Sequence, residues 1–257
     1  METIGNESKA KRFGKAAIDI VSFAALAVII ITIISVPFAT VLLKLGKEEA
    51  DTMSYFILSE TLMLAGVFLS AWIVWHLRGF SLEGLGRSLT MRWKDWLSGI
   101  LLATVLYAVG FGISLWAGAV EIAGVAFNPS SLLISLVFFL LVAVTEELAL
   151  RGFVLERLLQ SGVNKFCALF LSAALFSLIH IGNPNFDFLS FINILLAGIL
   201  LGSSYIYTRN LCFPIALHWF WNWIQGPVLG YEVSGNKFCN GLLALRLPEA
   251  SRRAKRS

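Results

Sequence analysis

Three short motifs place polar and ionisable side chains inside strongly hydrophobic runs of this chain. They are "EELALR" within "VTEELALRGF", "FSLIH" and "HWFWN". An ionisable residue within a membrane span costs about 2.5 to 3.5 kcal/mol on insertion scales and by default marks a functional site. Six residues of these motifs are therefore candidates for chemistry: Glu146, Glu147, Arg151, His180, His218 and Asn222.

The spacing of these residues separates the two adjacent glutamates. Residues four apart share one face of a helix, so Glu147 and Arg151 are expected to form an acid–base pair. A purely structural ion pair that locks one helix explains these two residues as well as a role in chemistry does. Glu146 points about 100° away around an α-helix and has no basic residue four positions along. His218 and Asn222, also four apart, present an imidazole and a carboxamide on one face.

These side chains suit the hydrolysis of an acyl bond, and we expect that the bond hydrolysed is a peptide bond. A glutamate removed from water can serve as a general base near neutral pH, so Glu146 suits the activation of water. An imidazole can orient that water or relay its proton. A second imidazole with a carboxamide can donate hydrogen bonds to an oxyanion. Phe176, four residues before His180, is expected to pack beneath the imidazole.

The same atoms allow a zinc site. Two histidines and one carboxylate make the three-ligand set of a catalytic zinc site with an open position for water, here Glu146, His180 and His218, and Glu147 is then left as a base. The zincin signature H-E-x-x-H is absent from the sequence. Zinc and a metal-free glutamate mechanism are both open.

The elements that position these residues are predicted to be membrane helices. Of the 257 residues, 58% are hydrophobic and 14% charged, and the mean hydropathy is +0.79, whereas a soluble domain has about 25% charged residues. About twenty consecutive apolar residues span a bilayer as a helix. We expect an all-α polytopic transmembrane bundle of about seven spans, with an active-site cavity between the fourth, fifth and seventh. The apolar runs cover about 18–43, 54–77, 96–118, 131–156, 166–182, 187–207 and 212–231.

Charge predicts how this bundle lies in the membrane. We expect one membrane domain over 1–257 that ends in a basic tail over 237–257. The N-terminal tail and the loop 78–95 each carry four Lys or Arg, and the loop 119–130 carries none, which places the N-terminus in the cytoplasm and the protein in the plasma membrane. Seven spans would leave the basic C-terminal tail outside, against this rule. Expected partners are the lipid bilayer and a membrane protein or peptide substrate, and not nucleic acid.

The three motifs, in this order on successive hydrophobic segments, resemble the E-E-x-x-x-R, F-x-x-x-H and H-x-x-x-N motifs of the CPBP intramembrane protease family. This family includes type II CAAX prenyl endopeptidases and bacterial proteins linked to bacteriocin processing and immunity. The resemblance runs over about 85–236. It implies that Glu146 activates the water. The other motif positions complete the implied site: Glu147, Arg151, His180, and the pair His218 and Asn222 that would hold the oxyanion.

The resemblance therefore implies a CAAX-protease-like endopeptidase, of a family described both as metallo and as glutamate-dependent. One departure concerns the C-terminus, since family members usually have another hydrophobic helix after the third motif and only about 35 residues follow Asn222 here. The alternative function is a non-catalytic membrane binding or immunity protein of the same fold. A transporter would be expected to show broken helices at matching positions of two halves, and the sequence shows no such symmetry.

Overall fold

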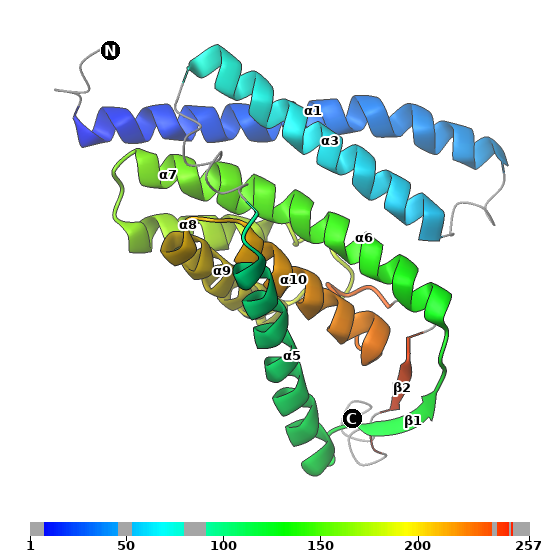
Figure 1. Cartoon of the computed structure of the whole chain (residues 1–257). Coiled ribbons are helices and arrows are strands. Elements are labelled where there is room, and N and C mark those ends of the chain that lie inside the picture. Colours follow the sequence, from blue (N-terminus) through cyan, green and yellow to red (C-terminus); the bar gives the residue numbers. More distant parts are fainter. Residues whose placement is uncertain (1–7, 46–52, 80–90, 238–240, 247, 249–257) are drawn as a thin grey trace.

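The computed structural model describes residues 8–45, 53–79, 91–237, 241–246 and 248 of the chain (Figure 1). In this part the chain is helical apart from one two-stranded sheet, which confirms the predicted all-α class. Most of the loop 78–95 and of the predicted basic tail 237–257 lies outside the described residues. The main helices are α1 Lys9–Leu45, α3 Met53–Arg78, α5 Trp93–Trp116, α6 Pro129–Glu147, α8 Lys165–Leu178, α9 Phe188–Thr208 and α10 Cys212–Trp223.

Five described segments are long and apolar enough to cross a membrane, namely Lys9–Phe38, Tyr55–Arg78, Trp93–Trp116, Pro129–Gln160 and Phe188–Thr208. The predicted runs 166–182 and 212–231 fall on shorter helices, so the count of seven spans is not confirmed. Helix α8 has 14 residues and ends at Leu178. Helix α10 has 12 residues and passes into the π-helix η2, Ile224–Val228, which contains Pro227.

The fourth span changes its geometry at the first motif. It begins after Asn128, whose side chain accepts a hydrogen bond from the Ser131 amide at 3.1 Å. Pro129 follows at the first position of α6, where a missing N–H costs nothing. Directly after Glu147 the chain continues as the π-helix η1, Leu148–Leu155, and then as α7, Glu156–Gln160. π-Helical turns inside α-helices are rare and frequently occur at functional sites.

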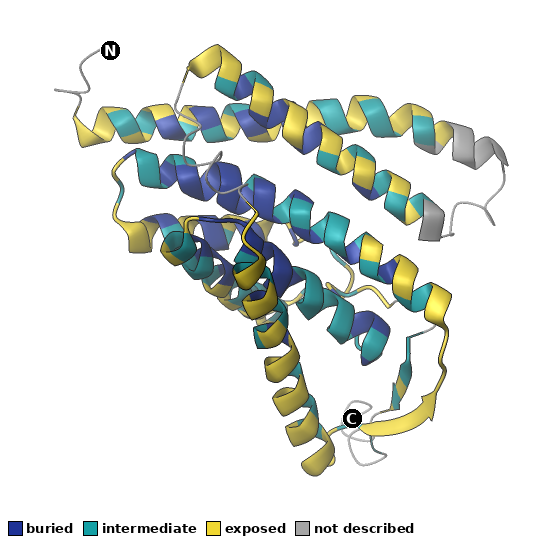
Figure 2. Ribbon diagram, viewed as in Figure 1, coloured by how far each residue is buried: buried dark blue, intermediate teal, exposed yellow. Residues whose placement is uncertain are grey.

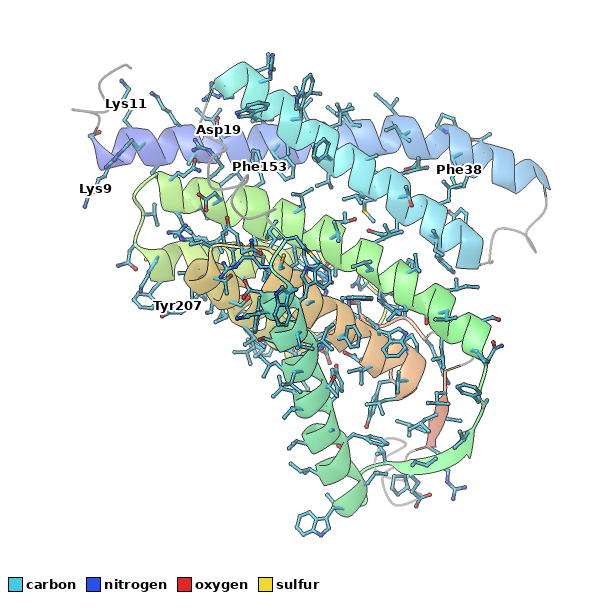
Figure 3. The ribbon with its side chains drawn as sticks, viewed as in Figure 1. Lys9, Lys11, Asp19, Phe38, Phe153 and Tyr207 are labelled. Carbon is cyan, nitrogen blue, oxygen red and sulfur yellow. The ribbon has the colours of Figure 1, made fainter. Side chains whose placement is uncertain are left out.

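The span α6–η1–α7 lies between two groups of helices (Figure 1). Helices α1 and α3 pack on one side of it, and α8, α9 and α10 contact its other side. Buried residues concentrate in η1, α7 and the helices around them, whereas α5 is exposed along most of its length (Figure 2). Phe153 of η1 stacks on Phe23 of α1 at 4.2 Å between ring centroids, and Figure 3 shows Phe153 where these helices meet.

Helix α5 packs against α10 through small residues. Gly99 and Ala103 are its buried positions, and a Cβ atom at Gly99 would lie 2.7 Å from the carbonyl oxygen of Phe213 on α10. Small residues let helix backbones approach closely within a membrane. This contact fixes the start of α10, the helix that carries the third motif.

Asp187 caps the start of α9. Its carboxylate accepts hydrogen bonds from the hydroxyl and the amide of Ser190, each at 2.7 Å. These hydrogen bonds hold the pKa of Asp187 below its usual value, and the bond from the hydroxyl has the larger effect. The cap therefore sets where the helix after the His180 turn begins.

A small sheet closes the end of the molecule opposite to the start of α1 (Figure 1). Strand β1, Glu121–Val125, lies between α5 and α6, and it pairs antiparallel with β2, Leu243–Arg246, which follows η2. Glu121 stands opposite Arg246 in this register, and their side chains form an ion pair at 2.7 Å. The chain after α10 thus returns to the linker between α5 and α6.

Candidate active site

Glu147 and Arg151 form an ion pair that is closed off from solvent. The Arg151 Nη1 atom lies 2.7 Å from Glu147 Oε1, and neither side chain has exposed area. Arg151 Nη2 donates to the carbonyl of Gly198 on α9 at 3.2 Å. Its guanidinium lies over the Phe176 ring of α8 at 4.6 Å. The pair therefore ties the fourth span to α8 and α9.

His218 of α10 faces both glutamates of the first motif. Its Nδ1 atom lies 2.9 Å from Glu147 Oε1, and its Nε2 atom lies 3.7 Å from Glu146 Oε2. Because the bond made by one ring nitrogen determines the role of the other, Glu147 directs Nε2 of the imidazole toward Glu146. The Glu146 side chain keeps 26% of its area exposed, whereas Glu147 keeps none. The two adjacent carboxylates thus have different surroundings.

Two tryptophans of α10 fix the position of His218 against the fourth span. Trp219 Nε1 donates to the Leu136 carbonyl at 2.8 Å, and Trp223 Nε1 donates to the Leu132 carbonyl at 3.1 Å. Each bond joins a turn of α10 to a turn of α6. Sequence analysis assigned no role to these indoles, although the aromatic residues around His218 in "HWFWNW" are the signal that could have pointed to them.

His180 joins this cluster through Phe176. The imidazole is buried just after the end of α8, and its Nδ1 atom lies 2.7 Å from the Phe176 carbonyl oxygen. The Phe176 ring meets the rings of His180 and His218 edge to face, at 4.8 and 6.0 Å between centroids. The prediction that Phe176 packs beneath His180 is confirmed.

Asn222 and His76 lie apart from these contacts. Asn222 is half-buried one turn after His218 on α10, and within the described residues no hydrogen bond links its side chain to the other motif residues. Its oxyanion role stays a prediction. His76 is exposed near the end of α3 and stacks on Trp72 at 5.2 Å.

The described residues contain no group of three or more His, Cys, Asp or Glu that is arranged to hold a metal ion. The Nδ1 atoms of both imidazoles are engaged, by the Phe176 carbonyl and by Glu147, which is the usual arrangement of a histidine that binds a metal through Nε2. The set Glu146, His180 and His218 therefore stays a prediction as a zinc site, and we derive no chemical step through a metal.

Fold and site together define a class of protein: a helical membrane protein that encloses two carboxylates, an arginine and two imidazoles in its interior. A family model described as "Type II CAAX prenyl endopeptidase Rce1-like" matches residues 128–224, a segment that contains all three motifs. The match confirms the resemblance to the CPBP family. The matched family implies a CAAX-type intramembrane protease function. Comparison with curated proteins and with solved structures gave no match.

Proposed function

We propose that the protein is an intramembrane endopeptidase that hydrolyses peptide bonds of membrane-associated proteins with water activated by Glu146. The observation that carries this proposal is the contrast between the two glutamates. Glu147 is closed off from solvent and contacts Arg151 and His218 through its Oε1 atom, whereas Glu146 is partly exposed and faces Nε2 of His218 at 3.7 Å. A general base must reach the water molecule that it deprotonates, and of the two glutamates Glu146 is the one with exposed area.

The hydrolytic step follows from this arrangement. The Glu146 carboxylate takes a proton from water as the water oxygen bonds to the carbonyl carbon. The oxygen of that carbonyl becomes an oxyanion, which His218 and Asn222 stabilise by hydrogen bonds. When the carbon–nitrogen bond breaks, the proton held by Glu146 passes to the leaving amine. His180 orients the attacking water.

Glu147 and Arg151 act as positioning residues in this scheme. One carboxylate oxygen of Glu147 contacts both Arg151 and His218, at 2.7 and 2.9 Å. Since Arg151 also binds Gly198 on α9, the ion pair keeps the His218 imidazole at a fixed angle to Glu146. The cost of burying the acid is offset by its arginine and imidazole partners.

The test is cleavage of a membrane-anchored reporter peptide library by the purified protein in nanodiscs. Glu146→Gln is expected to lower kcat by about 10²- to 10⁴-fold, the usual contribution of a general base, and His180→Ala is expected to lower it too. Glu121→Gln, which changes a half-exposed carboxylate on β1, is the matched control and should keep wild-type activity. A chelator arm tests metal dependence, and loss of wild-type cleavage on chelation would contradict the metal-free step.

A non-catalytic binding or immunity protein of the same fold is the second candidate. Its support is that the CPBP family, which the three motifs resemble, includes proteins linked to bacteriocin immunity. Glu146→Gln separates the two functions, because it should abolish an enzyme's activity and spare the binding of a partner. A protein that stays folded, cuts no reporter and retains its biological effect with Glu146→Gln would support the second candidate.

A further inference from the structure

Glu60 is an acidic residue buried in a membrane helix outside the segment that matches the protease family. It lies on α3, and 6% of its area is exposed. An ionisable residue within a membrane span is costly and rarely present without a role, and Glu60 takes no part in the ion pair that explains Glu147.

The packing of α3 on α6 places Glu60 beside the first motif. Phe56, one turn before Glu60, meets Phe138 of α6 edge to face at 6.1 Å between ring centroids. The two helices run in the same direction (Figure 1), so the following turn of α3 approaches the following turns of α6. The α6 side chains that face Glu60 are Thr145 and Glu146.

One oxygen of Glu60 has no hydrogen-bond partner. Oε1 is buried, and no described residue hydrogen-bonds to it. Thr145 donates to the Leu141 carbonyl at 2.8 Å, and its contact with the Glu60 side chain leaves Oε1 without a partner. A buried polar atom without a partner is destabilising, and most such atoms in folded proteins are paired. This oxygen is therefore available to a group that enters the site.

We propose that Glu60 is a further catalytic residue, which holds the attacking water together with Glu146. This inference rests on the proposed hydrolysis. Water has two O–H groups: one gives its proton to Glu146 as the oxygen attacks, and the other donates a hydrogen bond to Glu60 Oε1. Glu60 exchanges no proton, and it directs the oxygen lone pair toward the substrate carbonyl carbon. Two carboxyl groups on different helices thus hold one water molecule.

The kinetic test compares Glu60→Leu, which removes the acceptor, with Glu60→Gln, which keeps an acceptor oxygen on a side chain of equal length. We expect Glu60→Leu to lower kcat about 10²-fold with little change in KM, since misplacing a reacting group costs about that much. Glu60→Gln should restore most of kcat. Ser70→Ala is the control, because Ser70 is buried on the same helix and its hydroxyl donates to the Gly66 carbonyl of that helix. A wild-type kcat for Glu60→Leu would overturn the proposal.

An infrared measurement tests the shared water without relying on cleavage. Difference spectra in ordinary and heavy-oxygen water identify the O–H stretch of bound water in the purified protein. One band should be lost in both Glu60→Leu and Glu146→Gln and kept in Ser70→Ala. A band lost only in Glu146→Gln would overturn the role of Glu60. If wild type cuts no peptide, the proposed function fails, and the band alone then decides whether the two acids share a water.

Discussion

Two neighbouring glutamates of one motif are given different chemistry by their partners. Glu147 is enclosed by Arg151 and His218, each bound to the same carboxylate oxygen. Glu146, one position earlier, keeps exposed area and meets the other nitrogen of the same imidazole. A base needs access to water, and a positioning residue needs fixed partners. The proposed function assigns these two tasks to different carboxylates, and His218 contacts both of them.

The ion pair predicts a large stability effect at Arg151. Arg151→Met leaves Glu147 buried with its main positive partner removed, which should lower the free energy of unfolding by about 3 to 5 kcal/mol. Adding Glu147→Gln removes the uncompensated charge and should recover part of this loss. Chemical unfolding in detergent micelles measures both variants. A double variant no more stable than Arg151→Met would show that charge compensation is not the reason for the pair.

At the scale of elements, sequence analysis predicted local geometry better than tertiary contacts. The Glu147–Arg151 pair depends only on helical spacing, and the structure has it. The approach of His218 to Glu146 depends instead on how α10 docks on α6, through bonds from indoles to backbone carbonyls, which no local pattern encodes. The π-helix η1 was also not predicted, because its hydrophobic residues fit an α-helix equally well. The catalytic roles of the motif residues remain predictions.

The contact between α5 and α10 gives a prediction with a control on the same helix. A Cβ atom at Gly99 would lie 2.7 Å from the Phe213 carbonyl and 2.8 Å from the Leu217 amide. Both are backbone atoms of α10, so Gly99→Ala must displace the helix that carries His218. We expect lower thermal stability and reduced cleavage. Gly110→Ala, further along α5 with nothing within 4 Å, should leave both unchanged or raise stability by up to about 1 kcal/mol.

Measured by circular dichroism during heating, the two alanine variants should differ clearly in midpoint temperature. Equal midpoints and equal activity would contradict the assigned packing of α5 on α10. A loss of activity in both variants would instead point to a requirement for flexibility in α5. The comparison is sharp because both variants make the same chemical change in one helix.

At the scale of the whole molecule, the described basic side chains gather at one end. Asp19 connects α1 to α3 and α7 through ion pairs with Arg78 at 2.6 Å and Arg157 at 2.5 Å. Figure 3 shows Asp19 near the start of α1. Arg92 binds the Thr208 carbonyl at the end of α9. The described Lys and Arg side chains of this end are Lys9, Lys11, Arg12, Lys15, Arg78, Arg92, Lys94, Arg157, Lys165 and Arg209.

The end of the molecule at the sheet also carries basic residues, as the sequence predicted for the tail after the last apolar run. Lys237 and Arg246 lie there because the chain after α10 pairs with the linker between α5 and α6. Arg246 forms an ion pair with Glu121 at 2.7 Å. Among the described residues the other end carries more Lys and Arg, which favours a cytoplasmic start of α1 under the positive-inside rule.

This orientation sets the depth of the candidate site. His218 is the seventh residue of α10, which begins at the basic end at Cys212, so at 1.5 Å per residue it lies about 9 Å along the helix. The Glu146–His218 contact is therefore closer to the basic end than to the sheet. In the orientation that the positive-inside rule predicts, this contact lies in the cytoplasmic half of the bilayer.

Cysteine accessibility tests the orientation directly. In a background without Cys167, Cys212 and Cys239, a single Ser8→Cys or Phe127→Cys reports on one end of the molecule, since both positions are exposed. In intact cells a membrane-impermeant maleimide should label Phe127→Cys, and should label Ser8→Cys only after the membrane is opened. The physical reason is that anionic lipids of the cytoplasmic leaflet attract the Lys and Arg side chains at the start of α1. The reverse pattern would place the site in the outer half and direct the search for substrates to extracytoplasmic segments.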